Sequence, residues 1–167
     1  SKDMELYFLR DMENVLYIEG SDDLHDGLTE IREISSRNKT AFEEAVRSRK
    51  NLIPKTFYET REPAYIIIDD LDDMMAQYQT NLQELTQVFK LAVETGIGVI
   101  ATIHSSKPRG IDELNKWFKT SANGLVIGNQ GTTNIYPMVA LREMPVMGEG
   151  LLYTNSSYER LLLPKFE

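Results

Sequence analysis

Cysteine is absent from this sequence of 167 residues, and only two histidines occur in it. Disulfide bonds and thiolate metal sites are therefore excluded, and two histidines cannot form a zinc site without further ligands. Long apolar runs are absent as well, since none approaches the ~18 residues that a membrane span needs. The opening residues S-K-D-M-E-L contain no apolar stretch, so we expect no signal peptide there.

Positive charge is also scarce. The chain has 18 Lys and Arg against 26 Asp and Glu, which gives a net charge of −8, and its pI is about 4.9. No stripe of Lys or Arg interrupts this excess of acid. Because such a surface repels a phosphate backbone, we expect no nucleic acid partner, and a DNA translocase is disfavoured.

The remaining composition is that of an ordinary globular domain. Hydrophobic residues make up 41% of the chain and charged residues 26%. A chain of this length can bury a sizeable core. There are no repeats, no low-complexity segments and no internal linker. We therefore expect residues 1–167 to form a single domain.

Hydrophobic periodicity predicts alternating helices and strands. Strands are expected at residues 4–10, 15–19, 64–69, 97–103 and 124–128. Helices are expected at residues 22–49, 81–95 and 111–119, and an irregular link at residues 51–63. Residues 150–154 and 158–163 flank the turn signal N-S-S, which predicts a closing hairpin.

Two of these strands predict the fold class. Residues 64–69 and 97–103 are apolar on both faces and are separated by one helix. This pattern is typical of adjacent, central strands in a parallel sheet that helices cover on both sides, which makes the protein α/β with three layers. In such sheets ligands bind just beyond the carboxyl ends of the strands. Asp69 and Asp70 lie at that end of the first strand.

An acidic pair at this place has a known use in nucleotide hydrolases of the P-loop class. There an apolar strand ends in an Asp that holds Mg²⁺, usually through water, and the next residue is often a Glu that orients the attacking water. Asp69 stands at the metal position and Asp70 at the catalytic position, although Asp is one methylene shorter than Glu. The alternative is that these acids only end the strand and cap the next helix, since Asp72 and Asp73 suit a helix start.

Three segments resemble the FtsK/SpoIIIE-type ATPases. P-A-Y-I-I-I-D-D-L-D-D-M-M resembles their Walker B segment, and T-G-I-G-V-I-A-T-I-H-S-S resembles their following strand and sensor loop. G-E-G-L-L-Y-T-N-S-S-Y-E-R-L-L-L-P is similar to their closing hairpin. The resemblance covers most of residues 4–164. The acidic character and the tail indicate the type VII secretion branch, and within it the last ATPase domain of the EssC-type coupling ATPases.

The resemblance implies a RecA-like fold that binds ATP and Mg²⁺ between neighbouring ATPase domains of one protein, which could assemble as a hexamer. It implies a cytoplasmic domain of a membrane-anchored protein, with a role in exporting small helical-hairpin proteins of the WXG100 type. It also assigns site roles. Asp69 would hold Mg²⁺ and bind nucleotide, and Asp70 would be catalytic and nucleotide-binding. His104, which follows the sensor position, could contact a phosphate, and the alternative is that it is a bystander at the strand end.

The departures from the family pattern matter equally. No G-x-x-x-x-G-K-[ST] occurs, so we expect the first βα unit with its phosphate loop to be missing at the N-terminus. Ile103 occupies the sensor glutamine position, and no arginine occurs between Arg109 and Arg142. Arg109 in the loop K-P-R-G is a weak candidate for an arginine finger, and the alternative is that it is simply solvated. These departures predict a degenerate ATPase that is weak or inactive alone. The alternative is a non-hydrolysing module on the same fold that docks a substrate or a neighbouring domain.

Overall fold

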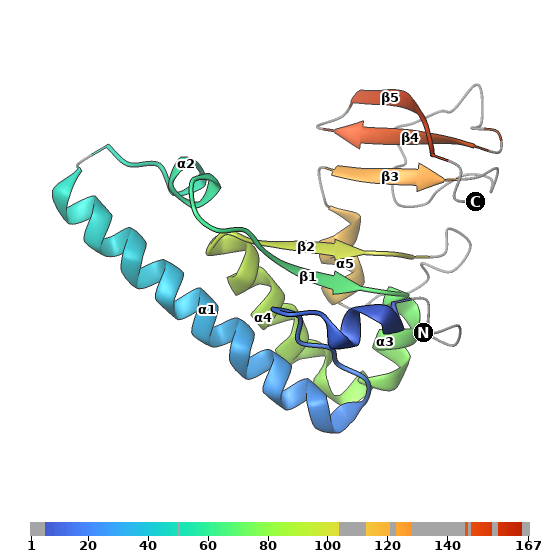
Figure 1. The fold of residues 1–167 in the computed structure, drawn as a ribbon, viewed down its shortest axis with the longest axis horizontal. Helices are drawn as coiled ribbons and strands as arrows, with labels where there is room; N and C mark the ends of the chain where they lie inside the picture. Colours follow the sequence, from blue (N-terminus) through green and yellow to red (C-terminus); the bar gives the residue numbers. More distant parts are fainter. Residues whose placement is uncertain are drawn as a thin grey trace. The chain divides into compact units, whose positions relative to one another are not determined.

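The computed structural model describes residues 6–49, 51–103, 113–120, 123–127, 146, 148–154 and 157–164. The chain divides into two compact units, Ser1–Ile103 and His104–Glu167, and each is described below by itself. The first unit contains a parallel sheet and the second an antiparallel one (Figure 1). The α/β class predicted from the sequence is confirmed.

The sheet of the first unit pairs β1 (Ala64–Ile68) with β2 (Ile97–Ala101) in parallel. Their register places Ala64 opposite Ile97 and Ile68 opposite Ala101. The chain passes from one strand to the other through α3 (Leu71–Gln77), a short 3-10 turn at Gln79–Asn81, and α4 (Leu82–Glu94). The predicted adjacency and parallel pairing of these strands are confirmed.

Helix α4 contributes four buried apolar residues to the core of the first unit, namely Leu85, Val88, Phe89 and Ala92. Its buried residues recur at helical spacing and face β2 and the long helix α1 (Ser21–Ser48). Two polar contacts join the two helices. Arg32 forms an ion pair with Glu84, and the side-chain amide of Asn38 donates to the carbonyl oxygen of Thr95 at 2.8 Å. Both predicted helices are confirmed, α1 within one residue at either end.

On the opposite face of the parallel sheet, no described residue of the first unit covers the apolar side chains. Tyr65 and Ile67 of β1 are 62% and 56% exposed, and Ile100 of β2 is 51% exposed. Among the described residues the sheet has two strands, so each has an unpaired edge. The prediction that both strands are central is therefore wrong for this part of the chain, and a third layer is not confirmed. A strand that is apolar on both faces can be buried on both faces, but its sequence does not determine which elements pack against it.

Three local predictions are wrong. In place of a strand at residues 4–10, the chain forms a 3-10 helix at Tyr7–Asp11, although residues 4 and 5 lie outside the described part. Residues 15–19 form no helix or strand, and the link at 51–63 contains α2 (Pro54–Glu59). The two predicted strands lack a partner strand among the described residues, and an isolated strand is not stable. The helix at Pro54–Glu59 begins with a proline, which is favoured in the first turn of a helix.

The second unit contains α5 (Glu113–Lys119), β3 (Asn123–Ile127), β4 (Glu149–Thr154) and β5 (Ser157–Leu162). The three strands form an antiparallel sheet in the order β3-β4-β5. Thr154 pairs with Ser157 across a two-residue connection, which confirms the predicted closing hairpin. The predicted helix at 111–119 and strand at 124–128 are confirmed within the described residues.

Candidate functional site

The site expected from the sequence lies where the two parallel strands end. Asp69 and Asp70 follow β1 directly, and Thr102 follows β2 directly. Because the strands are parallel and in register, their carboxyl ends meet at one edge of the sheet. The edge is partly open to solvent, since both aspartates are half-buried and Thr102 is exposed.

Thr102 binds four consecutive residues at the end of β1. Its backbone N–H donates to the carbonyl of Ile68, and its own carbonyl accepts the N–H of Leu71, both at 2.9 Å. Between them, its hydroxyl accepts the N–H of Asp70 at 2.8 Å and donates to Oδ1 of Asp69 at 3.3 Å. One residue of β2's end therefore organises the whole turn from β1 into α3.

Asp70 has an unusual backbone. Its φ of 56° and ψ of 88° lie on the left-handed side, which few residues other than glycine adopt and where Asp is enriched. Its Oδ1 accepts the backbone N–H groups of Asp72 and Asp73, each at 3.1 Å. This is an N-cap on α3, which satisfies two amides that the helix itself leaves unpaired. The geometry favours the capping alternative for Asp70, and its catalytic role stays a prediction.

Asp69 is engaged differently. Its carboxylate accepts a hydrogen bond from the Thr102 hydroxyl, and the residue is half-buried at the sheet edge. Among the described residues, no three His, Cys, Asp or Glu side chains gather closely enough to hold a metal ion. The role of Asp69 as a Mg²⁺ ligand therefore stays a prediction.

Two further candidate residues are not described by the structure. His104 and Arg109 lie outside the described residues. Ile103 is half-buried and has no polar side chain with which to orient water. The sequence analysis missed Thr102, although one signal was available. Thr102 follows an apolar parallel strand just as Asp69 does, so the rule that placed Asp69 at the sheet edge applies to it equally.

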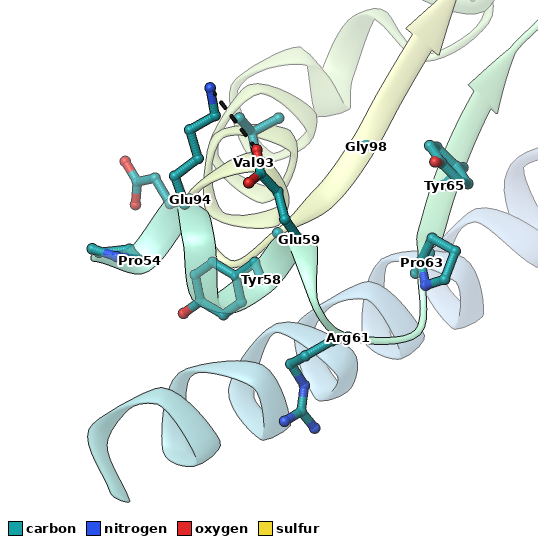
Figure 2. A pocket seen from close by; sticks show the side chains of 12 residues that line it. Pro54, Tyr58, Glu59, Arg61, Pro63, Tyr65, Val93, Glu94 and Gly98 are labelled. Atoms are coloured by element: carbon teal, nitrogen blue, oxygen red, sulfur yellow. Dashed lines mark ion pairs between the residues drawn. The ribbon is translucent and has the colours of Figure 1, made fainter. Parts of the chain in front are cut away.

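The described residues also line a shallow cavity of about 530 Å³, at the opposite end of the strands from Asp69 (Figure 2). Tyr58 and Tyr65 flank two glycines of its wall, so a Cβ on Gly96 would come within 2.5 Å of Tyr58, and one on Gly98 within 2.6 Å of Tyr65. Burial raises the pKa of the Tyr58 phenol. Polar and apolar groups alternate around the cavity, and it contains none of the predicted site residues.

Comparisons with known proteins bear on the fold. No protein-family model and no curated protein matches the chain, but solved structures do. A structure of EssC ATPases 2 and 3 from Geobacillus thermodenitrificans matches 99% of this chain and 30% of its own, with a TM-score of 0.77 and 15% identity. A structure of the cytoplasmic domain of EssC matches 100% and 33%, with a TM-score of 0.82 and 15% identity.

The chain shares the fold of EssC ATPase domains. This confirms the resemblance inferred from the sequence at the level of fold, since 15% identity supports no more. The chain spans about a third of the EssC chains it matches. Within the described part, no helix is both long and apolar enough to cross a membrane.

Proposed function

We propose that this chain is a C-terminal FtsK/SpoIIIE-like ATPase domain of a type VII secretion coupling ATPase, and that it takes part in exporting WXG100-type proteins. The observation that carries the proposal is the position of Asp69, at the carboxyl end of a parallel strand within a fold shared with EssC. Its neighbours would be other ATPase domains of the same protein, assembled as a hexamer. It would be the cytoplasmic part of a membrane-anchored protein.

The proposed ligand is ATP with Mg²⁺. When bound, Mg²⁺ neutralises charge on the phosphate oxygens. Asp69 would hold the ion through water on the protein's side, and His104 would be placed to meet a phosphate. Hydrolysis would be weak, because Asp70 caps α3 and Ile103 replaces a polar sensor residue. The domain would therefore bind nucleotide but hydrolyse it slowly.

Export measured in the host that encodes this chain tests the proposal. Deleting the gene should abolish secretion of WXG100-type proteins, and the wild-type gene should restore it. The Asp69→Asn variant should restore it only in part, because a neutral amide is a poorer partner for a hard dication. Normal secretion from the deletion strain would contradict the proposed pathway, and normal secretion with Asp69→Asn would contradict the nucleotide site.

The second candidate is a non-hydrolysing docking module, and the open apolar sheet face favours it. Ile67 is 56% exposed on β1, beside Tyr65 and Ile100. If docking is the function, Ile67→Ser should reduce export while Asp69→Asn does not. Ile127→Ser in β3 is a matched control, because Ile127 is 61% exposed in the other unit. The opposite pattern, with Asp69→Asn alone reducing export, would reject the docking module.

A further inference from the structure

We infer that Thr102 is a positioning residue of this site, whose hydroxyl directs the Asp69 carboxylate and, through the Asp70 amide, keeps the Asp70 carboxylate on the start of α3. The inference rests on the proposed function, because it assigns Thr102 a role toward the ligand that Asp69 would meet. It adds a residue for which the sequence analysis assigned no role.

The first step is that the position of Thr102 is fixed. Both backbone groups of Thr102 are bonded at 2.9 Å, the N–H to Ile68 and the carbonyl to Leu71. These bonds continue the β1–β2 pairing one residue beyond the strands. The hydroxyl therefore extends from an anchored backbone, although the residue is exposed. Rotation of the side chain is the main conformational freedom that Thr102 retains.

The second step is that the direction of each hydroxyl hydrogen bond is determined. The Asp70 amide can only donate, so the Thr102 hydroxyl accepts there at 2.8 Å. Its single proton then remains for Oδ1 of Asp69, 3.3 Å away. A hydroxyl performs both tasks at once, whereas valine, which has the same shape, performs neither. Serine retains both and loses only a methyl group.

The third step concerns the pair of acids. The hydroxyl holds the Asp70 amide while Oδ1 of Asp70 receives the Asp72 and Asp73 amides. The left-handed backbone of Asp70 is thus held from both sides. Adjacent carboxylates that could both point at one ligand are assigned different partners, with Asp69 on Thr102 and Asp70 on its own helix.

The first measurement needs no nucleotide. Amide hydrogen exchange followed by NMR on the whole chain should show the Asp70 N–H exchanging about tenfold faster in Thr102→Val, as loss of roughly one hydrogen bond predicts. The Thr102→Ser variant should stay near the wild type. Thr60→Val is the matched control, because the exposed Thr60 hydroxyl donates to the carbonyl of Phe57 at 2.8 Å and Thr60 precedes β1, whereas the site follows the other end of that strand. Unchanged exchange at Asp70 in Thr102→Val would overturn the inference.

The second measurement is export in the host. Thr102→Val should reduce secretion to the level of Asp69→Asn, while Thr102→Ser and Thr60→Val should keep it normal. If Asp69→Asn reduces export and Thr102→Val does not, the positioning role is overturned and the proposed function stands. If Asp69→Asn itself has no effect, the nucleotide site is rejected and the positioning role with it. Equal loss in Thr102→Ser and Thr102→Val would also overturn the inference, because the hydroxyl would then not be the group that matters.

Discussion

Two neighbouring aspartates with the same chemistry have different surroundings, and backbone conformation is the cause. Asp70 has a φ of 56°, which turns its carboxylate back toward the amides of Asp72 and Asp73. Asp69 keeps its side chain at the sheet edge beside Thr102. The sequence indicated two roles for this pair, metal-site acids or helix caps. It could not assign them individually, because the φ angle of Asp70 follows from the turn that Thr102 holds.

Substitutions of Asp70 should separate capping from catalysis. Asp70→Asn should change the free energy of unfolding by less than about 0.5 kcal/mol, because Asn caps helices and tolerates left-handed backbone as well as Asp does. Asp70→Ala should cost about 1–2 kcal/mol, because it removes the acceptor for two amides. Urea unfolding followed by circular dichroism measures both.

Asp73→Ala is the control for this comparison, since Asp73 is exposed in the same first turn of α3 and contributes its amide to the cap. It should cost less than Asp70→Ala, because only the favourable charge near the helix start is lost. Equal destabilisation by Asp70→Asn and Asp70→Ala would show that the charge of Asp70, and not its capping geometry, is what the fold requires.

At the scale of elements, the hydrophobic pattern located the two long helices of the first unit better than it located strands near the N-terminus. Helices α1 and α4 are joined by the Arg32–Glu84 ion pair and by the amide of Asn38 bonded to Thr95. Their apolar residues recur at helical spacing, which is why periodicity located both helices. Strands at residues 4–10 and 15–19 were predicted from β-forming residues alone, and neither has a partner edge among the described residues.

The Arg32–Glu84 pair should make stability depend on pH. The hydrogen bond from Arg32 is the main cause that lowers the pKa of Glu84 below its usual range. A carboxyl group whose pKa is depressed in the folded state contributes stability above its unfolded pKa of about 4.3, and loses it as the pH falls through the folded pKa. The free energy of unfolding of the wild type should therefore exceed that of Glu84→Gln by no more than about 1 kcal/mol at pH 7, because the ion pair is partly exposed.

The unfolding free energies of wild type and Glu84→Gln, measured between pH 7 and pH 3.5, check this expectation. The difference between them should shrink at the acid end. Glu59→Gln is a suitable control, since Glu59 pairs with Lys55 at 3.9 Å on the surface of α2 and is 62% exposed. A wild-type advantage that is the same at every pH would show that Glu84 stabilises by packing and not by its charge.

At the scale of the whole molecule, the chain has the fold of EssC ATPase domains without a phosphate-binding loop in its sequence. That loop supplies the backbone amides and the lysine that hold the phosphates of ATP. Among the described residues, no group of three metal-ligating side chains occurs. Fold and ligand affinity are separate properties, because a fold is set by packing and affinity by the groups that touch the ligand.

This chain should accordingly bind Mg·ATP only weakly. Isothermal titration calorimetry should give a Kd of about 1 mM or weaker, which corresponds to a binding free energy of roughly −4 kcal/mol at best. Asp69→Asn, measured in parallel, should bind no more tightly than the wild type. A micromolar Kd would mean that residues other than a glycine-rich loop hold the phosphates, and the proposal of a degenerate site would then be wrong.

The sequence by itself determined the α/β class, the long helices, the parallel strands β1 and β2, the closing hairpin and the place of Asp69. These features follow from local periodicity and from strand ends, which a sequence contains directly. Tertiary structure alone decided that Thr102 binds residues 68–71, and it showed that Asp70 forms the helix cap that the sequence offered as one alternative. Within the described part of the first unit, it also left the apolar side chains of one sheet face exposed. The physical reason is that hydrogen bonds between residues more than thirty positions apart, and the cover over a sheet face, depend on which elements meet in space. Hydrophobic pattern indicates only that such partners are needed.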